Sequence, residues 1–193
     1  AAFHDHLARE GLGARPNVRL VVTRCPFMGV AQQVCIPLLV RRLSPVTLYH
    51  YPHFDIPLLT HACSVVTVHD LNHVTLDAYF DSHRWLKRAY SFGTTALSLT
   101  RARHILAVSQ ATKDQILARF PWIAPEKISV TYEAVGDAFT VRPTLEQVTR
   151  FRRTFQLGDE RYVLYVGTDR AHKNLWRLLD AYPRLRQGSQ VSH

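Results

Sequence analysis

The chain has 193 residues, enough to bury one good core, or one domain and part of a second. Its 47% hydrophobic and 20% charged residues indicate a globular protein and exclude wholesale disorder. The net charge of +9 would suit nucleic acid, anionic ligands or a membrane surface. Because no RNP-like, zinc-finger or basic-helix motif accompanies the charge, we interpret it as solvated surface and expect no nucleic-acid partner.

The cysteines and the apolar runs predict a reduced, cytoplasmic location. Cys25, Cys35 and Cys63 form no CxxC pair, which argues against a disulfide framework or a cysteine zinc site. The longest apolar candidate, residues 34–40, is far below the ~18 residues that span a bilayer. The N-terminus lacks signal-peptide architecture, and we expect the chain to begin in mid-fold.

Apolar runs of strand and helix character alternate along the chain. In order, the predicted helices cover residues 3–8, 29–43, 77–102, 111–120, 143–157 and a segment from about 174. The predicted strands cover residues 18–23, 46–51, 64–68, 105–108, 127–135 and 162–166. We expect Pro37 to start or kink a helix, Gly93 to interrupt one and Ser109 to cap one.

This alternation predicts an α/β fold, with a Rossmann-like parallel sheet covered by helices on both faces. Ligands on such sheets bind beyond the carboxyl ends of the strands. The candidate site residues therefore follow the predicted strands: His50, His53, His69, Asp70, Ser109 and residues 167–173.

His69 and Asp70 directly follow the predicted strand 64–68 and allow three interpretations. With His50, His53 and His73 they could bind a metal, although metal-dependent HD phosphohydrolases carry this pair on helices. They could instead cap the strand and hydrogen-bond the next turn. They could also face a cleft and contact sugar hydroxyls or a phosphate.

Residues 162–185 predict a strand, a tight glycine turn and a helix with Leu175, Leu178 and Leu179 on one face. Free N–H groups at such a helix start favour an anion, usually phosphate, and Lys173 would add a full charge. The alternative is an ordinary turn with a solvent-facing lysine.

Elsewhere no GxSxG, P-loop, HExxH or GxGxxG motif occurs, and the spacing of Glu126 and Glu133 specifies no acid/base chemistry.

Five segments between residues 46 and 182 together resemble one family. They are LYHYPHFDIPLL, SVVTVHDLNHVT, ILAVSQATKDQIL, PEKISVTYEAVGDAF and YVLYVGTDRAHKNLWRLLDAY. In this order they resemble a retaining, family-4-like glycosyltransferase of the GT-B type, a group that includes mannosyltransferases of polysaccharide synthesis. The resemblance implies transfer of a hexose such as mannose from a nucleotide-diphosphate sugar to a saccharide or lipid-linked acceptor.

The resemblance also implies a domain plan. Residues 1–140 would form the acceptor-side Rossmann-like domain, 141–160 a connecting helix and linker, and 161–193 part of the donor domain. Family members begin with a strand and a glycine-rich loop, and they continue to a pair of glutamates that hold the donor. Because the chain lacks both, we expect a fragment with little or no transferase activity by itself, in the cytoplasm or peripherally on the membrane.

Site residues follow from the matching positions. The resemblance implies catalytic roles in the cleft for His50, His69 and Asp70. It implies contacts with the donor diphosphate for Gly167, Thr168, Arg170, His172 and Lys173. His172 and Thr168 stand where many members have arginine. Neither metal nor cofactor is expected, because protein cations can neutralise the departing phosphate.

Two alternatives of other classes remain. One is a non-catalytic α/β module that binds a partner or regulates, built on a transferase fold. The other, which we consider weaker, is a basic nucleic-acid-binding domain, and this would show steeply salt-dependent binding.

Overall fold

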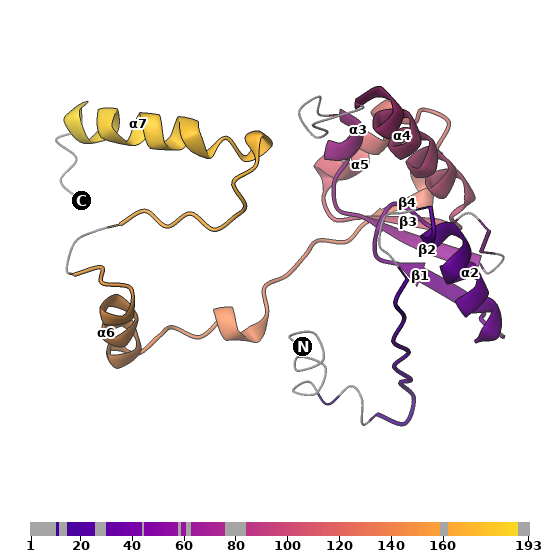
Figure 1. The fold of residues 1–193 in the computed structure, drawn as a ribbon, viewed down its shortest axis with the longest axis horizontal. Helices are drawn as coiled ribbons and strands as arrows, with labels where there is room; N and C mark the ends of the chain where they lie inside the picture. Colours follow the sequence, from indigo (N-terminus) through magenta and orange to yellow (C-terminus); the bar gives the residue numbers. More distant parts are fainter. Residues whose placement is uncertain are drawn as a thin grey trace. The chain divides into compact units, whose positions relative to one another are not determined.

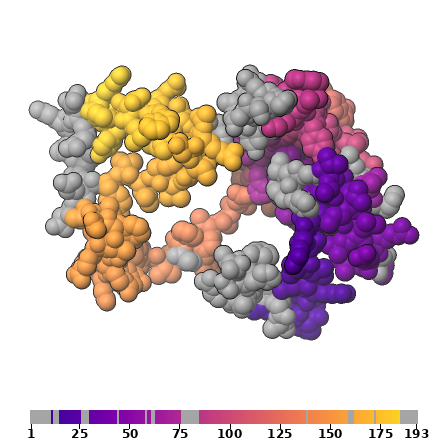
Figure 2. All heavy atoms as spheres, in the orientation of Figure 1, coloured from indigo at the N-terminus to yellow at the C-terminus, as the bar shows by residue number. Residues whose placement is uncertain are grey.

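The computed structural model describes residue 11 and residues 15–25, 30–43, 45–57, 59–60, 63–75, 84–158 and 162–188, drawn in colour in Figures 1 and 2. The chain divides into two compact units, one of Ala1–Thr47 with Pro57–Ala62 and one of Leu48–Ile56 with Cys63–His193. Each unit is considered by itself. The predicted helix 3–8 lies outside the described residues, and the predicted domain boundaries stay predictions.

The first unit contains helix α2, Gln32–Arg42, which continues through Pro37. The predicted strand 18–23 is wrong, because these residues adopt no regular structure and pair with no described strand. Leu20, Val21 and Val22 in this stretch are exposed. A β-favouring sequence becomes a strand only when a neighbour accepts its backbone hydrogen bonds.

The second unit contains a parallel sheet of four strands in the order β1-β2-β3-β4. The strands are β1 (Leu48–Tyr51), β2 (Cys63–Val68), β3 (His104–Ala107) and β4 (Ile128–Val130). Each lies within or beside a predicted run. Strand β4 is much shorter than the predicted 127–135, because only its first residues pair with β3.

Helices connect these strands and cover the sheet (Figure 1). They are α3 (Asn72–Thr75), α4 (Arg84–Arg101) and α5 (Gln110–Arg119). A parallel sheet flanked by helices confirms the predicted α/β class. The predicted break at Gly93 is wrong, since α4 continues through it. A glycine inside a helix costs only about 1 kcal/mol, which a long packed helix tolerates.

The core lies where alternate strand residues meet α4 and α5. Val66, Val68 and Ile105 are fully buried, while Thr67 and Leu106, which alternate with them along the strands, are half-buried. This period of two is typical of a strand with different faces. Away from this core, Trp85 and Tyr90 of α4 are exposed.

The remaining described α-helices are α6 (Leu145–Thr154) and α7 (Leu175–Gly188), and short 3₁₀ helices cover Pro125–Lys127, Asp137–Phe139 and Ala171–Lys173. α6 begins with a capping box formed by Thr144 and Gln147. The predicted strand 162–166 is wrong, because the segment pairs with no described strand. Among the helices formed by described residues, none has the length and apolar character needed to cross a membrane.

Candidate active site at the carboxyl edge of the sheet

The loops that follow β2 and β4 meet at the carboxyl edge of the sheet. His69 Nδ1 lies 2.8 Å from Glu133 Oε1. Both side chains are accessible, His69 being 48% and Glu133 67% exposed. A carboxylate accepts hydrogen bonds, so the imidazole donates from Nδ1. The structure therefore gives the predicted residue His69 a carboxylate partner.

The backbone around His69 and Asp70 is held by neighbouring elements. Thr112 Oγ1, in the first turn of α5, donates to the His69 carbonyl at 3.3 Å. Asp70 Oδ1 accepts the Asn72 N–H at 2.9 Å and so shapes the turn into α3. Ser109 Oγ accepts the Thr112 N–H at 3.1 Å, which confirms its predicted role as N-cap of α5. Asp70 thus makes the turn contact while its side chain stays exposed.

His50 lies inside β1, as the predicted strand 46–51 implies, and so does not follow the strand as the other candidate residues do. Its Nε2 atom is 2.8 Å from Thr67 Oγ1 on β2. Thr67 stands two residues before His69. The side chain of His50 is exposed, but it belongs to the face of the sheet and not to its edge.

His53, which follows β1, pairs with a buried carboxylate. Its Nδ1 atom lies 2.5 Å from Asp55 Oδ1, and Asp55 is only 6% exposed. Phe54 between them stacks on His73 with ring centroids 3.5 Å apart. These contacts fasten the loop after β1 to α3.

His73 is buried in α3 and makes a defined hydrogen bond. Its Nε2 atom is 3.0 Å from Thr95 Oγ1, and that hydroxyl donates to the Ser91 carbonyl at 2.7 Å. The hydroxyl proton is thus engaged, so His73 donates from Nε2. Burial lowers the pKa of His73 to about 4, and the ring is neutral at pH 7.

Phe54 lies against the rings of both His53 and His73, with ring centroids 4.0 Å and 3.5 Å away. In the part of the chain that the structure describes, no group of three or more His, Cys, Asp or Glu side chains is placed to hold a metal ion. His53 and His73 hydrogen-bond with Asp55 and Thr95, as given above. The contacts of these two histidines are those of structural residues.

The segment 162–170 carries three of the predicted diphosphate residues, Gly167, Thr168 and Arg170, has no regular secondary structure and bends at Gly167. The Tyr165 hydroxyl donates to the Thr168 carbonyl at 3.2 Å and so lies over Gly167. A Cβ atom on Gly167 would lie 2.7 Å from the Tyr165 hydroxyl oxygen. Glycine at this position lets the tyrosine fold back over the turn. The Arg170 N–H then donates to the Thr168 carbonyl at 2.9 Å.

A 3₁₀ turn, Ala171–Lys173, and left-handed Asn174 lead into α7. The helix begins close to the predicted position, and Lys173 is exposed beside its first turn. The structure does not describe the side chain of His172. Lys173 and Arg170 are both exposed, and their contact with a donor diphosphate stays a prediction.

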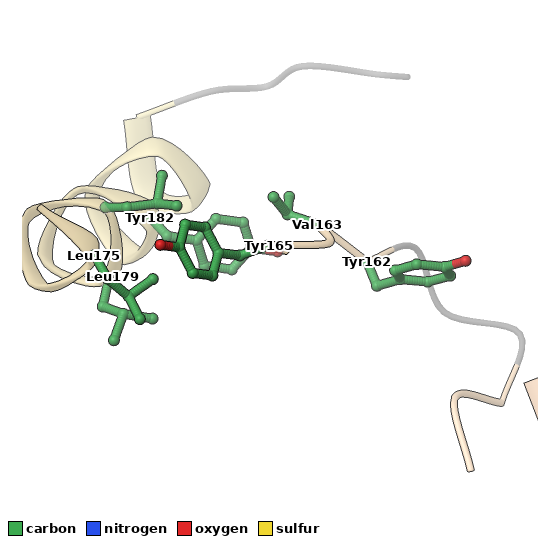
Figure 3. A pocket seen from close by; sticks show the side chains of 7 residues that line it. Tyr162, Val163, Tyr165, Leu175, Leu179 and Tyr182 are labelled. Carbon is green, nitrogen blue, oxygen red and sulfur yellow. The ribbon is translucent and has the colours of Figure 1, made fainter. Parts of the chain in front are cut away.

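An open apolar groove of about 320 Å³ lies between residues 162–165 and α7. Figure 3 shows Tyr165 and Tyr182 turned toward each other across it. The lining is almost entirely aliphatic and aromatic: Tyr162, Val163, Tyr165, Leu175, Leu178, Leu179 and Tyr182. Such a lining suits apolar packing and does not suit a diphosphate.

Sequence reasoning missed Glu133 and the buried cluster around His73. The rule of examining residues after each strand would have found Glu133, but the predicted strand 127–135 placed it inside a strand. Because β4 ends at Val130, Glu133 falls in the loop after it. The burial of His73 has no signal in residue spacing, since it depends on the packing of α3 against α4.

The sequence of the chain is similar to those of known proteins. A sequence model of glycosyltransferase family 4 matches residues 4–138. O-antigen chain mannosyltransferase B of Escherichia coli is 30% identical over 140 residues, covering 72% of this chain and 35% of that protein. O-antigen chain mannosyltransferase RfbU of Salmonella typhimurium is 28% identical over 123 residues, covering 64% and 29%.

The chain thus spans about a third of the length of these relatives. No solved structure matches it significantly. The matched region contains the four-stranded sheet and the linked residues His69 and Glu133. Since this match covers well over half of the chain, the protein belongs to glycosyltransferase family 4.

Proposed function

We propose that the chain is part of a retaining glycosyltransferase that transfers mannose from a nucleotide-diphosphate sugar to a saccharide or lipid-linked acceptor. Family membership and the names of the two relatives support the reaction class and the sugar. The observation that carries the proposal is the accessible His69 and Asp70 pair at the carboxyl edge of the sheet. Parallel α/β sheets bind their ligands at this edge.

On the acceptor side, His69, Asp70 and His50 are the proposed catalytic residues. His69 and Asp70 offer an imidazole and a carboxylate to sugar hydroxyls, groups that orient such ligands by hydrogen bonds. His50 approaches the same ligand from the face of β1. Its present partner, Thr67, is a neutral hydroxyl that a ligand group can replace.

On the donor side, the proposed diphosphate contacts are Gly167, Thr168, Arg170, His172 and Lys173. Sugar transfer develops negative charge on the departing diphosphate. A cation beside it stabilises the transition state more than the ground state. Exposed Lys173 at the start of α7 suits that role, and the first N–H groups of α7 add to it. Protein charges do this work in the proposal, without a metal or a cofactor.

Calorimetric titration of GDP-mannose and GDP tests the donor side. We expect Lys173→Ala to weaken binding of both by about tenfold, the effect of losing roughly 1.4 kcal/mol. Arg150→Ala removes the same charge from exposed α6 and is the matched control. Equal affinities of the three proteins would contradict the diphosphate role.

Nucleotide release from GDP-mannose with lipid-linked saccharide acceptors tests the reaction, and His69→Ala should abolish any turnover found. Because the chain spans about a third of its relatives, binding is measured alongside turnover. A folded, monodisperse chain that binds no sugar nucleotide would favour the non-catalytic module. Steeply salt-dependent RNA or DNA binding would favour the basic-domain alternative.

A further inference from the structure

The hydrogen bond between His69 and Glu133 joins two loops that are 64 residues apart in the chain. In the sheet, β3 lies between β2 and β4, so the bond passes over the carboxyl end of β3. The Thr131 N–H donates to the Ala107 carbonyl at 2.8 Å, which continues the β3–β4 ladder one residue beyond β4. This contact directs the chain that carries Glu133 toward the sheet edge where His69 lies.

The partner determines which nitrogen of His69 carries the proton. An ionised carboxylate accepts only, so the neutral imidazole must be protonated at Nδ1 and has its lone pair on Nε2. Free histidine prefers the opposite tautomer, protonated at Nε2. Because the two neutral tautomers differ little in free energy, one charge-assisted hydrogen bond suffices to reverse the preference.

We propose that Glu133 is a positioning residue, which holds His69 as the Nδ1–H tautomer so that Nε2 accepts a hydrogen bond from a sugar hydroxyl. The nature of that ligand rests on the proposed function, whereas the tautomer does not. Glu133 contacts the imidazole at Nδ1, and Thr112 holds the backbone of the same residue through the His69 carbonyl. A ring held at Nδ1 loses less rotational freedom when a ligand binds.

The exposure of the pair makes this role separable from a role in folding. Exposed ion pairs contribute little to stability. We therefore expect Glu133→Ala to unfold at the same temperature as the wild type. Glu126 is also an exposed glutamate close in sequence, and it makes no hydrogen bond to His69, so Glu126→Ala is the matched control.

Long-range ¹H–¹⁵N NMR of the histidine rings in the 193-residue chain, at mildly alkaline pH, tests the proposal. His69 signals are assigned by their loss in His69→Gln. The wild type and Glu126→Ala should show a protonated-type Nδ1 and an unprotonated-type Nε2 shift for His69. In Glu133→Ala the two shifts should exchange, and Glu133→Gln should restore the wild-type pattern in part through its amide oxygen.

An Nε2–H tautomer in the wild type, or an unchanged pattern in Glu133→Ala, would overturn the proposal. Titration with methyl α-D-mannopyranoside separates it from the proposed function. A shift of His69 Nε2 in the wild type that is lost in Glu133→Ala would support both. A switched tautomer with no response to the sugar would support the role of Glu133 and count against a sugar ligand at His69.

Discussion

His73 lies in α3, stacked on Phe54 and 2% exposed. The sequence HDLNH placed it among candidate ligands, but a histidine's chemistry depends on its solvent exposure. Burial keeps this ring neutral, and its Nε2–H is directed to Thr95. His69, four residues earlier, is exposed and paired with a carboxylate. The two histidines of this motif thus differ in role because their surroundings differ.

The burial of His73 predicts acid sensitivity. The unfolded chain has the ordinary histidine pKa of 6.5, whereas the pKa of folded His73 is lowered to about 4. Between these values the unfolded state binds a proton that the folded state does not. The free energy of unfolding should therefore fall as the pH drops from 6.5 to 4, by about 3 kcal/mol at most, and level off below.

Urea unfolding over this pH range measures the effect. His73→Gln retains a donor for Thr95 and cannot titrate, so its stability should fall less steeply. If both proteins lost stability in parallel, the dependence would belong to other groups. The difference between their curves isolates His73.

Among the elements, two helix starts followed local capping rules, whereas two of the predicted strands did not form. Ser109 caps α5 and Thr144 with Gln147 caps α6, both through side chains close in sequence. The runs 18–23 and 162–166 have equally strong β-favouring composition, yet neither finds a described strand to pair with. A cap is satisfied within one turn, whereas a strand needs a partner from elsewhere in the chain.

The two caps should differ in their effect on stability. Ser109→Ala should lower the free energy of unfolding of the sheet unit by about 1 kcal/mol, because α5 packs on the core through Ile116. Thr144→Ala should reduce protection from hydrogen exchange in α6 alone, since α6 has no buried residue. Urea unfolding combined with hydrogen exchange checks both, and equal global losses would contradict the distinction.

At the scale of the molecule, the hydrophobic core formed by the described residues lies in the sheet, α3, α4, α5 and the loops beside them. Val66, Leu99, Ile105 and Phe120 are all fully buried, while the described part of 162–188 has no buried side chain. Cooperative stability therefore resides in the sheet and its helices. Ligand binding by residues 167–173 should therefore be separable from the stability of the sheet and its helices.

A pair of truncations tests where stability resides. Ile105→Ala leaves a cavity in the core and should lower the free energy of unfolding by about 2–5 kcal/mol, the usual range for such a truncation. Val163→Ala, at a residue 67% exposed, should change stability by less than about 0.5 kcal/mol. Urea denaturation measures both. A large loss for Val163→Ala would show that the extended segment packs into the folded core.

The sequence by itself determined the α/β class, the approximate positions of the four strands, the N-cap at Ser109 and His69 with Asp70 as edge residues. These features depend on local periodicity, on side chains within one helical turn and on the general rule for parallel sheets. The tertiary structure alone decided which β-favouring runs became strands, where β4 ends and that Glu133 meets His69. Each of these depends on partners far away in the chain, and the contact of Glu133 with His69 spans 64 residues.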